Sequence, residues 1–325
     1  MRELNLGALL VIAASPMLIA QGTPALAHAR QQFDARNWEV AKQEYAALAR
    51  ATPNDVTPVL YLGRIALAQG ETEEGIKQFE RCAAINENVA DCHLWLGNAL
   101  GNAAMHTSKF KLPFLAKRTK REFDRAVELD PNNIDARSGV FQYYMLAPGF
   151  LGGSMDKARE QAAEIDKRSK LRGALAYGLL ADREKNPREA EAAYQRAVTA
   201  APDSGVGYNA LVNLYAREKR WNDAFAMLDR VVVHAPSETN VLLAIARVAY
   251  MSGEQLAKGE DAAKRWIASP PKDATTNTQA VAHLRLGHIY EKTGRRDLAR
   301  AEYERALALN PKYEEAKKAL DGVKR

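Results

Sequence analysis

The sequence predicts an all-α fold, a right-handed α-solenoid of about eight helix–turn–helix repeats with a C-terminal capping helix. Three observations predict it. Small, aromatic and proline residues recur at a spacing of about 34 residues. No stretch alternates apolar and polar residues long enough to predict a sheet. Each unit can bury its apolar stripe only against its neighbours, so the 325 residues are expected to form one stack of repeats instead of two domains.

The clearest repeat lies near the C-terminus, at 280–313. Gly287 and Ala299 are small, which lets two helices cross closely, and Tyr303 fills the space between units. Pro311 ends the second helix because proline cannot continue it. This spacing resembles the tetratricopeptide repeat family, here of the exported bacterial type. The resemblance implies stacked helix pairs that bind other proteins and perform no catalysis.

The same spacing predicts that residues 28–325 form the solenoid and divides them into consecutive repeats. The predicted repeats lie near 28–55, 56–89, 90–131, 132–170, 171–204, 205–238, 239–279 and 280–313, and a charged capping helix follows at 314–325.

The N-terminus has the features of a secretory signal peptide at 1–27. Residues 6–20 carry no charge, and the small residues Ala25 and Ala27 mark a cleavage site after Ala27. The apolar run is short for a membrane span, so we expect a periplasmic or secreted protein. The alternative is a buried first helix.

Two insertions interrupt the period, near 101–118 in the third repeat and near 147–154 in the fourth. Both fall between the first and second helix of their repeat. Equivalent turns of adjacent repeats lie along one edge of a solenoid, so the sequence predicts that the insertions are neighbours and form one non-repeating patch.

The second insertion reads APGFLGGS and precedes a helix start at which Ser154 is a good N-cap. Its glycines could expose backbone N–H groups to a phosphate. No Walker or dinucleotide-binding pattern is present, however, so no nucleotide is expected. We interpret Phe150, Gly152, Gly153 and Ser154 as parts of a structural or partner-binding loop.

The first insertion is basic. Arg118, Arg121 and Arg125 share a helix face, with Lys117 adjacent. Such a face could bind an acidic protein segment, an anionic glycan or lipid headgroups, or it could simply be solvated. Nucleic acid is a poor match to a secreted chain.

Cys82 and Cys92 are the only cysteines. They are expected on helices that pack together, so a structural disulfide is predicted, with two buried thiols as the alternative. The six histidines match no metal or haem motif, and no cofactor is expected.

The predicted inner wall of the solenoid is mixed, with Asn98 and Tyr143 as candidate contacts for a peptide or partner helix. Trp95 and Ala244 stand where a carboxylate clamp of this family needs polar residues, so that clamp is not expected. The sequence therefore predicts a non-catalytic protein-interaction scaffold of the cell envelope. The alternatives are a module that binds anionic lipid or glycan through the basic helix face, and an enzyme with an unrecognised site.

Overall fold

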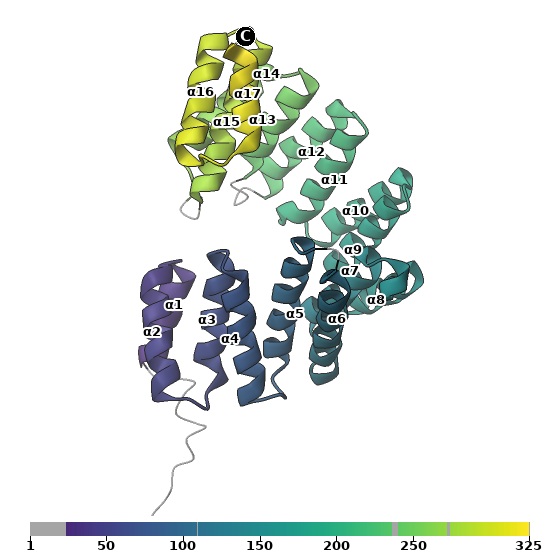
Figure 1. Cartoon of the computed structure of the whole chain (residues 1–325). Coiled ribbons are helices and arrows are strands. Elements are labelled where there is room, and N and C mark those ends of the chain that lie inside the picture. The colour runs from purple at the N-terminus through teal and green to yellow at the C-terminus, as the bar shows by residue number, and fades with distance from the viewer. Residues whose placement is uncertain (1–23, 109, 236–239, 272–273, 325) are drawn as a thin grey trace, which may run out of the picture. The chain divides into compact units, whose positions relative to one another are not determined.

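The computed structural model describes residues 24–108, 110–235, 240–271 and 274–324. Most of the predicted signal peptide (1–23), residue 109 of the first insertion and Arg325 of the predicted cap lie outside these residues. The described chain contains helices and turns and no strand, which confirms the all-α prediction (Figure 1).

The chain folds into two compact units, with the boundary between Tyr143 and Tyr144. The described residues of unit 1 form six complete helices and most of a seventh that crosses the boundary. They are α1 (Pro24–Asp34), α2 (Trp38–Ala51), α3 (Val56–Ala68), α4 (Thr72–Ile85), α5 (Ala90–Met105), α6 (Leu112–Leu129) and α7 (Ile134–Leu146).

Unit 2 begins in the last turn of α7. It continues with η3 (Gly149–Leu151), α8 (Met155–Arg168), α9 (Lys170–Arg183), α10 (Pro187–Ala200), α11 (Gly205–Arg217), α12 (Trp221–His234), α13 (Val241–Ser252), α14 (Leu256–Ala268), α15 (Thr276–Lys292), α16 (Arg296–Leu309) and α17 (Glu314–Lys324).

Within each unit the helices pack in consecutive pairs, as in α3 with α4, α5 with α6, and α15 with α16 (Figure 1). Adjacent pairs also pack on each other, as α4 packs on α5 and α10 on α11, and first helices of adjacent pairs touch, as α3 touches α5 and α13 touches α15. This is the predicted solenoid architecture, while its right-handed sense stays a prediction. The last helix, α17, buries Ala316 and Leu320 against the final pair, so it caps the stack.

Glycine on a first helix lets an aromatic ring of the second helix lie directly on the backbone. A Cβ atom at Gly178 would lie 2.1 Å from the Tyr194 ring, and one at Gly287 would lie 2.4 Å from the Tyr303 ring. Gly63 and Gly97 stand in the same relation to the rings of Phe79 and Phe123. Because protein interiors are close-packed, the aromatic ring and the absence of a side chain on the glycine together determine how the two helices cross.

Most of the pairs share a short turn. In five of them a three-residue turn contains one left-handed residue, with φ between 56° and 80°, two positions after the first helix ends. These residues are Arg36, Gly70, Lys185, Lys219 and Gly294. The pairs α5–α6 and α7–α8 have longer connections, which coincide with the predicted insertions.

Much of the first insertion is helical. The sequence places the end of the first helix near Gly101, but α5 continues to Met105 because Asn-Ala-Ala-Met follows and alanine favours a helix. Helix α6 begins at Leu112, with Pro113 in its first turn, where a missing N–H costs little. The insertion therefore lengthens both helices, and of its described residues 106–108 and 110–111 lie between them.

No helix in the described part of the chain is both long enough and apolar enough to cross a membrane.

We predict that Gly287→Ala destabilises the protein by about 1–3 kcal/mol, because the new methyl group must displace the fully buried Tyr303 ring. The matched control is Gly322→Ala on α17, where a Cβ would meet no heavy atom within 4 Å. That change should stabilise the helix by up to about 1 kcal/mol. Urea denaturation followed by circular dichroism measures both. Equal effects of the two substitutions would contradict the close-packed crossing.

Candidate partner-binding surfaces

Two arginines of the predicted basic face are engaged by acidic residues. Arg118 of α6 forms an ion pair with Glu80 of α4, and the Arg121 guanidinium lies 2.7 Å from the Glu122 carboxylate. Lys117 is exposed on the same helix. The arginines therefore also act within the unit, where exposed pairs of this kind contribute little stability.

Arg125 holds a loop. Its guanidinium donates to the side-chain oxygen of Asn88, in the α4–α5 connection, at 3.0 Å, and it pairs with Glu128 at 3.3 Å. Arg125 is predicted to bind a partner, but part of its guanidinium group is used in a contact that joins two repeats.

The glycine-rich loop is closed by its own backbone. The N–H groups of residues 151–154 all donate to carbonyl oxygens of residues 144–149, at 2.9–3.1 Å. Since these N–H groups are used, the loop offers no ready cradle for a phosphate.

The loop residues have separate roles. A Cβ at Gly153 would lie 1.7 Å from the Ala147 carbonyl oxygen, and Gly152 has a left-handed backbone, φ 92°. The Ser154 hydroxyl accepts from the Lys157 N–H and caps α8. Phe150 alone among the predicted site residues of this loop projects a large side chain into solvent, with 83% of it exposed.

The two remaining predicted contacts differ. Asn98 is exposed on α5 and is available to a partner. Tyr143 is only 8% exposed and belongs to the core, so little of its ring is open to a partner, and its predicted contact stays a prediction. The insertions lie in different units, and their adjacency stays a prediction.

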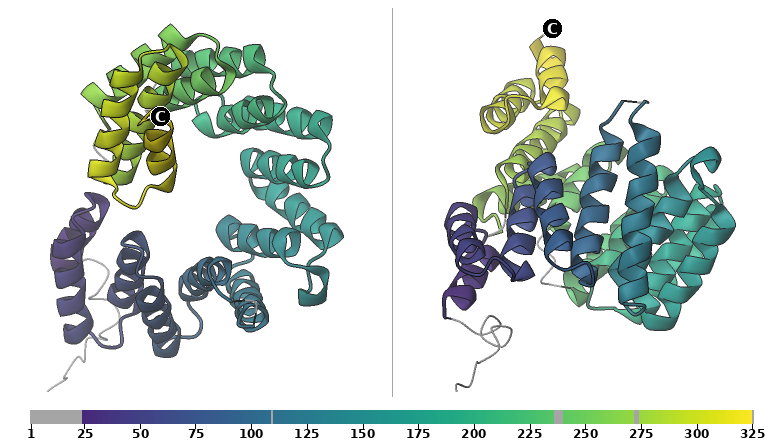
Figure 2. Two further views of the ribbon diagram at one scale, coloured as in Figure 1. Left: turned by 45° about the horizontal axis from the view of Figure 1, so that its top comes forward. Right: turned by 60° about the horizontal axis from the view of Figure 1, so that its bottom comes forward.

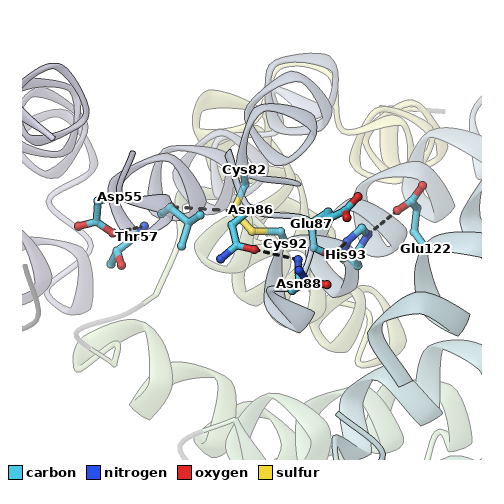
Figure 3. Close-up of a disulfide and its surroundings, with 10 residues drawn as sticks. Asp55, Thr57, Cys82, Asn86, Glu87, Asn88, Cys92, His93 and Glu122 are labelled. Carbon is cyan, nitrogen blue, oxygen red and sulfur yellow. Dashed lines mark hydrogen bonds and ion pairs between the residues drawn. A yellow bond between two sulfur atoms is a disulfide. The ribbon is translucent and has the colours of Figure 1, made fainter. Parts of the chain in front are cut away.

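Cys82 of α4 and Cys92 of α5 are joined by a disulfide, with Cα atoms 5.6 Å apart, within the normal range for such a bond (Figure 3). The next residue, His93, turns to the other side of α5. Its Nδ1 atom lies 2.8 Å from a carboxylate oxygen of Glu122 on α6. Consecutive residues of α5 thus fix that helix to both of its neighbours.

His93 and Glu122 are both buried. The other ring nitrogen of His93 lies 3.0 Å from the carbonyl oxygen of Glu87. Each nitrogen of the His93 ring therefore contacts an oxygen atom of the same chain. Burial raises the pKa of Glu122, but the hydrogen bonds from His93 and Arg121 outweigh it and hold the pKa below its ordinary value of 4.5.

A second pair of this kind occurs in α15 and α16, where His283 Nδ1 lies 2.6 Å from the buried Glu302 carboxylate. In both pairs the histidine stands four residues before the crossing glycine, and the glutamate stands directly before the aromatic residue that covers it. Sequence reasoning tested the histidines only as metal ligands and missed these pairs. Within the described residues no group of three or more His, Cys, Asp or Glu could hold a metal ion.

In unit 2, side chains of the first helices form a polar and aromatic surface. We define the first-helix surface of unit 2 by Asn213, Arg247, Tyr250, Arg285 and His288. Arg247 of α13 donates to the Asn213 side chain of α11 at 2.6 Å, and Tyr250 stacks on His288 with ring centres 4.8 Å apart.

Arg285 is the most buried cation of this surface. It donates to the Leu243 carbonyl oxygen at 2.7 Å. Burial and then repulsion by Arg247 lower the pKa of Arg285, while Glu315 opposes that shift. Among the described residues neither Arg247 nor Arg285 has a carboxylate within 4.0 Å. The positive charges of Arg247 and Arg285 therefore repel each other, and no carboxylate of the described residues pairs with either group.

In unit 1 the corresponding helices present aromatic rings. The Arg64 guanidinium lies 4.8 Å from the ring centres of Phe33 and Tyr61 and 4.7 Å from that of Trp95. Its Nε atom is buried without a hydrogen-bond partner. Cation–π contacts hold this arginine among α1, α3 and α5.

Comparison with known proteins identifies the architecture. Models of the tetratricopeptide repeat match residues 26–90, 172–204 and 280–313, which lie in both units. The chain contains tetratricopeptide repeats at these residues. A crystal structure of a tetratricopeptide repeat protein from Parabacteroides merdae aligns with a TM-score of 0.54 and 13% identity, over 93% of this chain and 98% of that one.

A chain of the APC/C hetero-tetramer Cut9–Hcn1 aligns with a TM-score of 0.50 and 13% identity. This alignment covers 93% of the present chain and 55% of the chain from the Cut9–Hcn1 complex. At these identities the likeness shows the fold alone. No curated protein matches the sequence significantly.

We predict a pH dependence from the buried pair. Because the folded pKa of Glu122 lies below its ordinary value, its contribution to stability is present above about pH 4.5 and is lost as the pH falls through the folded pKa. Glu122→Gln should cost about 1–3 kcal/mol at neutral pH and flatten the acid side of the stability curve.

Urea denaturation between neutral pH and about pH 3 measures this effect. The control is Glu128→Gln, an exposed carboxylate of the same helix, which should leave the curve unchanged. A variant at Glu122 with the parent's acid slope would contradict the prediction.

Proposed function

We propose that the protein is a non-catalytic scaffold that binds an acidic, extended segment of a partner protein on the first-helix surface of unit 2. The observation that carries this proposal is the pair Arg247 and Arg285, which lies without a carboxylate within 4.0 Å in the described chain. Carboxylates of a partner would complete the pair, since arginine binds them through two parallel hydrogen bonds.

The surface around the pair supports a peptide as the ligand. The Asn213 amide can bond a peptide backbone, and the stacked rings of Tyr250 and His288 give an apolar contact beside the charges. Burial raises the pKa of Tyr250, so its hydroxyl keeps its proton and can donate. Tetratricopeptide repeats are protein-binding scaffolds. The chain from the Cut9–Hcn1 complex, which aligns with a TM-score of 0.50, is part of a hetero-tetramer.

The chemistry of the buried pairs supports a non-catalytic protein. In the His93–Glu122 pair both ring nitrogens of the histidine are occupied by acceptors of the same chain. Such a histidine has no free nitrogen with which to take a proton from a substrate. We therefore assign the pair to stability.

The basic helix face has less support as a site for anionic lipid or glycan. Arg118, Arg121 and Arg125 each contact an acid of unit 1, so much of their charge is already balanced.

We further propose that the protein is exported and acts in the cell envelope. A disulfide persists best in an oxidising compartment, which supports this location. Cleavage after Ala27 would remove the first turn of α1, including Leu26, which packs against the first core cluster. The mature first helix would then begin near His28.

For the binding proposal we predict that arrays of synthetic peptides bind in proportion to their content of Asp and Glu, and that added salt weakens this binding. Arg247→Gln should lower the affinity for the best acidic peptide about tenfold or more, measured by fluorescence anisotropy.

Arg300→Gln is the matched control. Arg300 is exposed on α16, which is the second helix of its repeat in unit 2, and it pairs with Glu304. It should leave the affinity unchanged. If basic or neutral peptides bind equally well, or if both variants lose affinity equally, the proposed site is wrong.

For the export proposal we predict that expression in a bacterium from the natural start yields a chain that begins at His28. Its mass, measured without reduction, should correspond to a disulfide between Cys82 and Cys92. Placing charges in the apolar run, with Leu9→Arg and Leu10→Arg, should leave the precursor uncut and its thiols open to alkylation. An intact N-terminus in the parent protein would refute export by this route.

A further inference from the structure

The end of the α5–α6 hairpin exposes large apolar side chains. Met105 at the end of α5 is 74% exposed, Phe110 in the turn is 97% exposed, and Phe114 in the first turn of α6 is 70% exposed. The right panel of Figure 2 shows this turn projecting past α3 and α4. We call Met105, Phe110 and Phe114 the hairpin tip. Three such side chains at one projecting end are unusual, because soluble proteins rarely gather them on the surface.

The surroundings of the hairpin tip are cationic. The stretch 92–121 contains six Lys or Arg residues and no Asp or Glu. Nearest to the tip, Lys111 and Lys117 are exposed, and no carboxylate of the described chain pairs with either. The charge that the tip presents is therefore positive.

The apolar and cationic groups follow an order along α6. Lys111, Phe114 and Lys117 are three residues apart and share one face, with Arg121 one turn further. At a rise of about 1.5 Å per residue, Lys117 lies about 5 Å behind Phe114 along the helix. Interfacial segments bury their apolar side chains about 5–10 Å into a bilayer, so this unpaired cation would reach the level of the lipid phosphates.

We propose that the hairpin tip docks on an anionic lipid bilayer. Met105, Phe110 and Phe114 enter the interface between headgroups and acyl chains, while Lys111 and Lys117 bind the phosphates around them. This inference is independent of the peptide site in unit 2, which uses other residues.

A bilayer suits the tip better than a protein groove does. Apolar groups at the end, with Lys111 beside them and Lys117 behind them, match the layering of a membrane surface, where the apolar interior lies beneath charged headgroups. The exposed Phe150 in the other insertion differs, because no Lys or Arg occurs in 147–154. Phe150 therefore provides a matched comparison.

The test is co-sedimentation of the full chain with vesicles. Vesicles of phosphatidylglycerol and phosphatidylcholine in equal parts should bind the protein, and pure phosphatidylcholine should bind it much less. Replacing Phe110 and Phe114 together by serine should lower the partition coefficient at least about tenfold. Lys111→Gln and Lys117→Gln should each lower it about fivefold.

Phe150→Ser should leave vesicle binding unchanged, and none of these substitutions should shift the melting temperature. All of the variants share the apolar N-terminal run, so a second measurement reports the hairpin tip itself. The added fluorescence of Phe114→Trp over the parent should be quenched by brominated lipid, and that of Phe150→Trp should not.

Full binding by the double serine variant together with unquenched Phe114→Trp fluorescence would overturn the proposal. In that case the hairpin tip would remain available to an acidic protein partner instead. The acidic-peptide binding of unit 2 should be the same in every hairpin variant, so this inference and the proposed function can fail separately.

Discussion

The architecture depends on one contact that recurs along the chain, an aromatic ring packed onto a glycine of the preceding helix. The Phe123 ring shows how far this goes, because it touches Gly97 on one side and Gly139 on the other, and so joins α5, α6 and α7. A ring held this way sets the distance and the rotation between helices. The side chain one position before the ring and the side chain one turn before the glycine are then fixed in register, which is how the His93–Glu122 pair comes to be buried.

The repeats could be predicted from the sequence because this contact has a local signature. Gly287, Ala299 and Tyr303 stand at fixed distances along the chain, so their spacing alone indicates two crossing helices. The turns are only partly predictable. Gly70 and Gly294 mark left-handed positions, whereas Lys185 and Lys219 adopt the same backbone without any sequence signal. The predicted end of α5 near Gly101 is too early, because the alanines beyond that glycine continue the helix.

The candidate surfaces were less predictable, because they depend on partners far apart in the sequence. The face shared by Arg118 and Arg121 follows from helical spacing, but the acid that binds Arg118 is Glu80 on another helix. Arg247 and Arg285 lie on different repeats and meet only when α13 and α15 pack. The sequence places Tyr143 on the inner wall of the solenoid, but how much of its ring is exposed there depends on packing between helices, which leaves 8% of it accessible.

The disulfide and the buried ion pair lie at the base of the long α5–α6 hairpin, whereas its apolar end lies about 18 Å away, twelve helical residues beyond His93. The base of the hairpin is therefore fixed to α4 by a covalent bond and within itself by the His93–Glu122 contact, while its apolar end stands beyond both. Reduction of Cys82 and Cys92 would remove the covalent cross-link between α4 and α5, so a single pair of sulfur atoms decides whether the hairpin is cross-linked to the preceding repeat.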